Sequence, residues 1–205
     1  MKVSAVITRP TISLDNTKKS AILSSLVIVA GLVAGSVIYL LCSEDFTNNL
    51  FDYLISFATD FSNKNKPEIY LGLVLQNLIY YILMLIFGTS VIGTPAVFLI
   101  SFIKTIGLSF LTTYLYDTFA LKGIEYCLLI IFPGKFFLIF AMVLLTQNCY
   151  CTSTDIMKSM KIKDSRGVNF KKFTARSLLI LLILIASSII DFIMIISFSS
   201  LFELA

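Results

Sequence analysis

The stretch that most constrains the fold is residues 69–116, which are 48 residues with a single charged side chain, Lys104. The apolar core of a bilayer is about 30 Å thick, and a helix rising about 1.5 Å per residue crosses it in about 20 residues. The stretch is therefore too long for one crossing. It divides at residues 88–95, where two glycines and a proline favour a tight turn. We predict a hairpin of two membrane helices, residues 69–87 and 95–116, because a soluble helical pair would need polar outer faces that these residues do not supply.

Composition extends this interpretation to the whole chain. Hydrophobic residues make up 58% of the 205 positions, charged residues make up 14%, and the mean hydropathy is +0.93, well above the range of soluble domains. We predict an all-α fold, a polytopic transmembrane helix bundle. It would form one transmembrane domain over residues 20–205, after a cytoplasmic segment of residues 1–19.

The residue types exclude most catalytic chemistry. Histidine is absent, so the commonest metal ligand and the commonest general base are missing. Among the four cysteines, Cys149 and Cys151 lie close together but have no second pair to complete a zinc site. The sequence has no phosphate-binding loop, zinc-protease motif or serine-hydrolase motif. We expect no catalytic residue, cofactor or metal, and no nucleic-acid partner, because the basic residues flank membrane segments.

Three further apolar stretches, residues 20–43, 136–154 and 177–202, bring the predicted number of spans to five. For the first, a cleaved signal peptide is the alternative, but the stretch is longer than a typical signal core and lacks a small-residue cleavage site. Residues 121–132 are apolar but too short to cross, and Pro133 and Gly134 follow them. We therefore predict a half-depth helix there, which ends before the fourth span. Lys135 would then reach the outer surface.

The connection between the first two spans, residues 44–68, carries five acidic residues and two lysines. Within it, residues 48–62 have an apolar stripe at helical spacing opposite polar residues. This pattern predicts an interfacial helix in the first outer loop. The same stripe is a candidate face for binding a partner, and the two interpretations are compatible. The candidate partner face consists of Leu50, Leu54, Phe57 and Phe61.

Lysine and arginine predict the orientation, since they concentrate in cytoplasmic loops. Residues 158–176 carry seven basic residues and one acid. With five spans, this segment shares a side with the N-terminus and the 88–94 turn, while the 44–68 and 117–125 connections share the other side. We predict a multi-pass protein of the bacterial cell membrane with a cytoplasmic N-terminus and an outside C-terminus.

Polar residues inside the predicted spans are the remaining candidates for chemistry. Such residues face the interior of a bundle and either pair with one another or line a path. We interpret them as packing or pairing positions, with a transport path as the alternative. For Lys104 and Asp191 we predict a salt bridge near mid-membrane; the alternative is that Lys104 extends to the inner surface and Asp191 bonds to Ser187 or Ser188. The full set is Gln76, Asn77, Lys104, Gln147, Asn148 and Asp191.

Small residues and prolines are predicted to shape the helix contacts and turns. Gly31 and Gly35 form a GxxxG motif, which lets another helix approach closely. Helix packing is the favoured interpretation, and self-association of the chain stays open. The other predicted packing and turn residues are Gly88, Gly93, Pro95, Gly107 and Pro133.

The chain resembles the stage II sporulation protein M family of bacterial integral membrane proteins. The resemblance rests on the acidic amphipathic outer loop, the Gln76-Asn77-Leu78 motif, the 87–95 turn sequence, the 102–110 segment and the proline before the fourth span. It covers about residues 20–205. Thr105 departs from the pattern, because it stands where a glycine is expected, and Gly134 stands where a larger polar residue is common.

This resemblance implies a non-enzymatic membrane scaffold of the sporulation engulfment machinery. Members of the family localise two peptidoglycan-degrading partners, stage II sporulation proteins D and P, at the membrane. The alternative function is a permease-like subunit that works with a cytoplasmic ATPase through the basic 158–176 loop. A membrane enzyme is a third, less favoured function. The lipid bilayer is a partner under all three.

Overall fold

The computed structural model describes residues 14–42, 66–162 and 170–198, and these residues are helical apart from short turns, with no strand among them. The elements in chain order are α1 (Leu14–Leu41), α3 (Lys66–Gly88), α4 (Gly93–Tyr126), the π-helical segment η1 (Cys127–Ile131), α5 (Phe132–Ile162) and α6 (Phe170–Phe198). The all-α prediction is confirmed for the described residues. The predicted interfacial helix at residues 48–62 lies outside them, as do residues 199–202 of the last predicted span.

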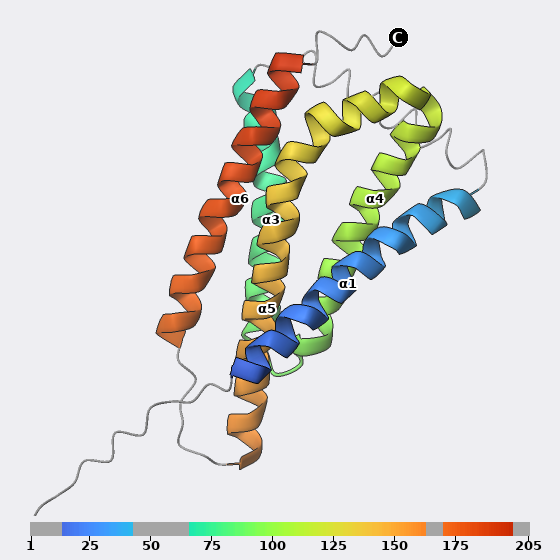
Figure 1. Cartoon of the computed structure of the whole chain (residues 1–205). Helices are drawn as coiled ribbons and strands as arrows, with labels where there is room; N and C mark the ends of the chain where they lie inside the picture. Colours follow the sequence, from blue (N-terminus) through green and yellow to red (C-terminus); the bar gives the residue numbers. More distant parts are fainter. Residues whose placement is uncertain (1–13, 43–65, 163–169, 199–205) are drawn as a thin grey trace, which may run out of the picture.

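Four helical stretches of the described chain are long and apolar enough to cross a membrane: Lys18–Leu41, Pro67–Gly88, Gly93–Met160 and Phe170–Ser197. The third contains 68 residues, far more than the roughly 20 that one crossing needs. It changes direction at Ala120, which has φ of 46° and ψ of −123°. Figure 1 shows α4 rising to this bend and α5 returning alongside it.

The predicted helix break at Pro133 was wrong, because the chain stays helical from the bend through η1 into α5. The backbone N–H of Phe132 donates to the carbonyl of Cys127, five residues earlier, so the turn before Pro133 is widened. A widened turn accommodates a proline, which lacks an N–H and would otherwise clash with the carbonyl four residues before it. The residues of the predicted half-depth helix therefore continue without a break through η1 into α5.

The helix ends gather at two ends of the bundle (Figure 1). One end holds the start of α1, the turn between α3 and α4, the end of α5 and the start of α6. It carries the basic side chains Lys18, Lys19, Lys158, Lys171, Lys172 and Arg176. The opposite end holds the α4–α5 bend and the start of α3, with the acidic residues Glu68, Asp117 and Glu125. The described charges are therefore mainly basic toward the first end, where Asp155 also lies, and mixed at the second, where Lys66 and Lys122 accompany the three acids.

Helix α5 forms the centre of the bundle, since it contacts α1, α3, α4 and α6. Its side chains Leu138, Met142 and Leu145 are almost completely buried. Large apolar side chains cover the outer surface instead, including Leu26, Leu41 and Leu179, which are 61%, 80% and 62% exposed. A surface of this kind suits hydrocarbon, because a water-soluble protein exposes only limited apolar patches.

Candidate functional site

The interface between α5 and α6 contains an ion pair that the sequence did not reveal. The ammonium Nζ of Lys135 lies 2.8 Å from the carboxylate Oδ2 of Asp191. Asp191 is almost fully buried, whereas the Lys135 side chain is 24% exposed. The predicted pair of Lys104 with Asp191 was wrong, because Asp191 is occupied by Lys135. Lys135, which we predicted to reach the outer surface, pairs with Asp191 and keeps 24% of its side chain exposed.

Gly134 is the residue that makes this ion pair possible. A Cβ atom at Gly134 would overlap the carboxylate of Asp191, so only glycine lets α6 seat its acid against the start of α5. The Ser187 hydroxyl donates to the Gly134 carbonyl at 2.8 Å and fixes the same contact from one turn earlier. Helices that approach this closely in a membrane typically do so over small residues.

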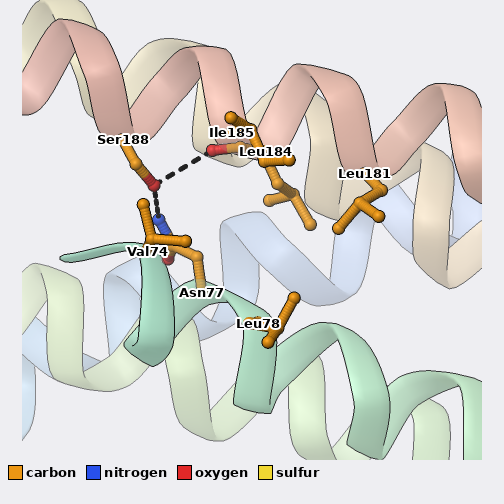
Figure 2. Close-up of a pocket in the computed structure, with 7 residues that line it drawn as sticks. All are labelled: Val74, Asn77, Leu78, Leu181, Leu184, Ile185 and Ser188. Atoms are coloured by element: carbon orange, nitrogen blue, oxygen red, sulfur yellow. Dashed lines mark hydrogen bonds between the residues drawn. The ribbon is translucent and has the colours of Figure 1, made fainter. Parts of the chain in front are cut away.

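Asn77 connects α3 to α6. Its Nδ2 atom donates to the Ser188 hydroxyl at 2.9 Å, and that hydroxyl donates to the Leu184 carbonyl at 3.1 Å. Figure 2 shows this chain of bonds beside a small cavity with mostly apolar walls. The cavity has a volume of about 10 Å³, which is room for one water molecule at most. Asn77 is therefore a packing residue that links two helices.

Asn148 has the same role between α5 and α6. Its Nδ2 atom donates to the Ser177 hydroxyl at 3.0 Å and to the Phe173 carbonyl at 3.3 Å. Its neighbour Gln147 is half-buried and also takes part in a polar interaction. Two of the predicted polar positions, Asn77 and Asn148, thus attach α6 to different helices at different heights.

The GxxxG motif of α1 packs against α4. A Cβ atom at Gly31 would overlap the Thr105 hydroxyl, and one at Gly35 would overlap the Ile106 carbonyl. The Ser36 and Ser109 hydroxyls lie 2.8 Å apart, and the Thr113 hydroxyl donates to Ser36 at 3.2 Å. Thr105, the position that departs from the family pattern, is fully buried opposite Gly31.

The hydroxyl groups of this contact were missed by sequence reasoning, although their spacing was visible. Ser101, Thr105, Ser109 and Thr113 recur every four residues along α4. Ser101 extends the network in another direction, because its hydroxyl lies 2.7 Å from that of Thr146 and 3.3 Å from that of Tyr80. Residues four apart lie on one helix face, so this spacing was a signal from which a polar contact line could have been predicted.

The turn residues lie where the helices α3, α4 and α5 meet. A Cβ atom at Gly93 would overlap the Phe87 carbonyl, so the 88–93 turn needs glycine there. A Cβ atom at Gly88 would lie 2.7 Å from the Sγ atom of Cys149. Pro95 stands in the first turn of α4, where no intrahelical donor is needed. Gly107 differs from these, because a Cβ there would have no neighbour within 4 Å, and it packs against none of the described residues.

Lys104 and Gln76 line an open groove of about 410 Å³ between α3 and α4. The other lining residues are apolar or aromatic: Ile79, Tyr80, Leu83, Ile100 and Ile103. Lys104 is half-buried and makes no ion pair with any described residue, while Gln76 is exposed. This groove is separate from the α5–α6 ion pair.

Every buried polar side-chain atom in the described part of the chain has a hydrogen-bond partner. The hydroxyls of Ser24, Thr105 and Thr152 bond to carbonyls of their own helices, whereas groups such as those of Asn77, Asn148 and Asp191 bond between helices. An unpaired polar atom would be costly in an apolar interior. Lys104, in the α3–α4 groove, is half-buried and has no counter-ion among the described residues. The predicted partner face at Leu50, Leu54, Phe57 and Phe61 lies outside the described residues.

Comparison with known proteins gives a match to a family model. The family model described as stage II sporulation protein M matches residues 24–197, which include all the helices above except the ends of α1 and α6. No curated protein and no protein of solved structure gives a significant match. Because the family model spans most of the sequence, the chain belongs to the stage II sporulation protein M family.

Proposed function

We propose that this protein is a non-enzymatic membrane scaffold that holds peptidoglycan-degrading partners at the membrane during engulfment in sporulation. Family membership supports the process. The observation that carries the scaffold role is that every buried polar side-chain atom of the described residues has a partner, and that Asn77, Asn148 and Asp191 are engaged in contacts between helices. A bundle whose polar groups are used in this way is suited to present surfaces to other membrane proteins.

The proposal includes five crossings with a cytoplasmic N-terminus. The bend at Ala120 within residues 93–160 supports counting this segment as two of the five crossings. The basic side chains at one end of the bundle support placing that end in the cytoplasm. Reporters fused after residues 55, 120, 165 and 205 would then be outside, outside, inside and outside. A cytoplasmic reporter signal after residue 205 would contradict the five-crossing topology.

Partner recovery tests the scaffold role directly. We expect affinity purification in mild detergent to recover membrane-associated wall hydrolases, which the family resemblance suggests are stage II sporulation proteins D and P. The double substitution Phe57→Ser and Phe61→Ser should lower that recovery at an unchanged membrane level of the protein, because it removes the apolar stripe of residues 48–62. The matched control is Asn49→Ser with Asp60→Asn, which changes the polar side of the same segment. Loss of the protein itself in the Phe variant would mean that the stripe anchors the chain in the bilayer.

A permease-like subunit is the second candidate, and the groove of Lys104 and Gln76 is the observation that favours it. Under that function a nucleotide-binding subunit would copurify with the protein, in contact with the basic residues around 158–176. Recovery of such a subunit without wall hydrolases would replace the scaffold with the permease.

A further inference from the structure

We propose that the α3–α4 groove holds a membrane-spanning helix of a partner protein, and that this helix carries a carboxylate which pairs with Lys104. The inference rests on the proposed scaffold function for the kind of partner, and it adds where and by what chemistry that partner binds. Four observations carry it: the shape of the groove, the charge in it, the two bare glycines beside it, and an analogous contact inside the same bundle.

The groove lies between the antiparallel helices α3 and α4, and its two polar residues lie at similar heights along them. Gln76 lies 12 residues before Gly88, and Lys104 lies 11 residues after Gly93, so the two stand at about the same distance from the turn. The apolar walls on either side include Ile79, which is 51% exposed, and Ile103, which is 58% exposed. A volume of about 410 Å³ with apolar walls suits the side chains of another helix.

Two glycines leave backbone uncovered next to the groove. Gly72 precedes Gln76 by four residues, and Gly107 follows Ile103 by four residues, so each lies on the groove side of its helix. A Cβ atom at either glycine would meet nothing within 4 Å. At each of the other glycines of the described helices a Cβ would meet atoms of the folded chain, so these two are the positions where a further helix could approach closely.

Lys104 supplies the charge complementarity. It lies 11 residues into α4, about 16 Å along the axis at about 1.5 Å per residue, which is near the middle of a bilayer core about 30 Å thick. None of the described residues gives it a counter-ion, and the nearby Lys135 ammonium repels it. An intramembrane lysine is normally paired or reaches water, so an anion at the same depth would stabilise it.

The α5–α6 interface shows how this chain already satisfies such a lysine. There Lys135 follows a glycine, Gly134, and the carboxylate of Asp191 sits over that glycine and pairs with the ammonium. On α4 a lysine and a glycine, Lys104 and Gly107, again share one helix face, but no acid of a described helix covers them. The groove therefore resembles the α5–α6 interface without its acid-bearing helix.

Depth and charge select the occupant. A lipid phosphate belongs at the bilayer surface, whereas a helix can hold a carboxylate at mid-membrane. A second copy of this chain fits poorly, because Asp191 is already paired and the other described acids, such as Glu68, Asp117 and Asp155, lie toward helix ends. The partner that fits is a different membrane protein with an aspartate or glutamate near the middle of its span.

A synthetic helix tests this chemistry with the full-length protein in vesicles. The probe is a labelled Leu-Ala helix of about 23 residues, long enough to span, with one Asp at its centre, and the matched probe has Leu at that position. In phosphatidylcholine vesicles, energy transfer should show the Asp probe binding about tenfold more tightly than the Leu probe. That ratio should fall to about one in the Lys104→Gln variant and in the Gly107→Leu variant, which adds a side chain on the groove side at a position whose Cβ would meet no described atom. An unchanged ratio in either variant overturns the proposal.

Other occupants give other results. If adding phosphatidylglycerol removes the advantage of the Asp probe for the wild-type chain, the groove binds a lipid and the proposal is overturned. If unlabelled protein self-associates through Lys104, the occupant is a second copy and the proposal is also overturned. The scaffold function has a separate outcome: wall hydrolases recovered equally with the wild-type chain and Lys104→Gln would keep the scaffold and overturn the groove. Binding of the Asp probe without any recovery of wall hydrolases would keep the groove proposal and overturn the scaffold function.

Discussion

Lys104 and Lys135 each have a glycine within three residues in the sequence, but they lie in different surroundings. Lys135 lies at the α5–α6 interface, beside Gly134 and 2.8 Å from the carboxylate of Asp191. Lys104 lies in the α3–α4 groove, on the same helix face as Gly107, without an acid beside it. The comparison shows that a lysine with a glycine nearby on a helix forms an ion pair where a neighbouring helix supplies an acid, as α6 does for Lys135. No described helix supplies an acid to Lys104.

The α5–α6 interface is therefore a closed contact, and the α3–α4 groove is an open one. If this distinction is right, substitutions in the first should lower the free energy of unfolding of the protein itself. Equivalent substitutions in the second should leave folding unchanged and act on partner binding. Three predictions test that distinction, from the largest expected effect to the smallest.

The largest effect is expected at the ion pair. Lys135→Ala should lower the free energy of unfolding by about 3 kcal/mol, because it leaves the buried Asp191 carboxylate without its partner. Asp191→Ala should lower it by up to about 3 kcal/mol, because the Lys135 ammonium that it leaves unpaired is 24% exposed. Lys104→Ala should lower it by less than about 0.5 kcal/mol, since no described partner is lost. Reversible unfolding in mixed detergent micelles measures all three.

A double-mutant cycle provides the control for this prediction. The Lys135→Ala, Asp191→Ala double variant should be less destabilised than the sum of the single variants, because neither charge remains unpaired. Additive effects would mean that the two side chains do not stabilise each other. A loss at Lys104 as large as that at Lys135 would contradict the distinction between the closed and open contacts.

An intermediate effect is expected at the glycines. Gly134→Ala should cost about 1–3 kcal/mol of unfolding free energy, because its Cβ would overlap the Asp191 carboxylate. Gly107→Ala, the matched control, should be neutral or slightly stabilising, since its Cβ meets no atom and alanine favours helix. The same micelle unfolding measurement compares them. Equal destabilisation at both positions would show that the groove is closed in the folded protein.

The smallest effect is expected at the polar side chains. Asn77→Ala and Asn148→Ala should each cost about 0.6 kcal/mol and at most about 1.7 kcal/mol, the range for hydrogen bonds between membrane helices. Gln76→Ala, one position before Asn77, should cost less, because Gln76 is exposed in the groove. Thermal denaturation in detergent can rank the three variants. A larger loss for Gln76 than for Asn77 would place the stabilising contact in the groove.

Much of the fold followed from the sequence because span length and charge are local properties. The lack of charge between Glu68 and Lys104 predicted the α3 helix, and the glycines and proline of residues 88–95 predicted the turn after it. The GxxxG motif predicted a closely packed contact for α1, and its contact with α4 is of that kind. The sequence could not identify α4 as the neighbour, because a helix face of small residues can pack against any of several helices.

The pairing of charges could not be predicted for a related reason. Depth along the helix suggested Lys104 for Asp191, but depth says nothing about which way each helix is turned. The rotation of α6 places Asp191 over Gly134, and the widened turn at Cys127–Ile131 carries the helix through Pro133 so that Lys135 lies beside that acid.

The sequence by itself determined that this chain is a bundle of apolar helices, with the described basic residues concentrated at one end. Hydropathy and charge act residue by residue against the solvent, so they can be read without knowing the neighbours. Only the tertiary structure decided that Asp191 pairs with Lys135 and that Lys104 is left in an open groove. Contacts of that kind depend on the rotation and crossing of whole helices, which many residues set together.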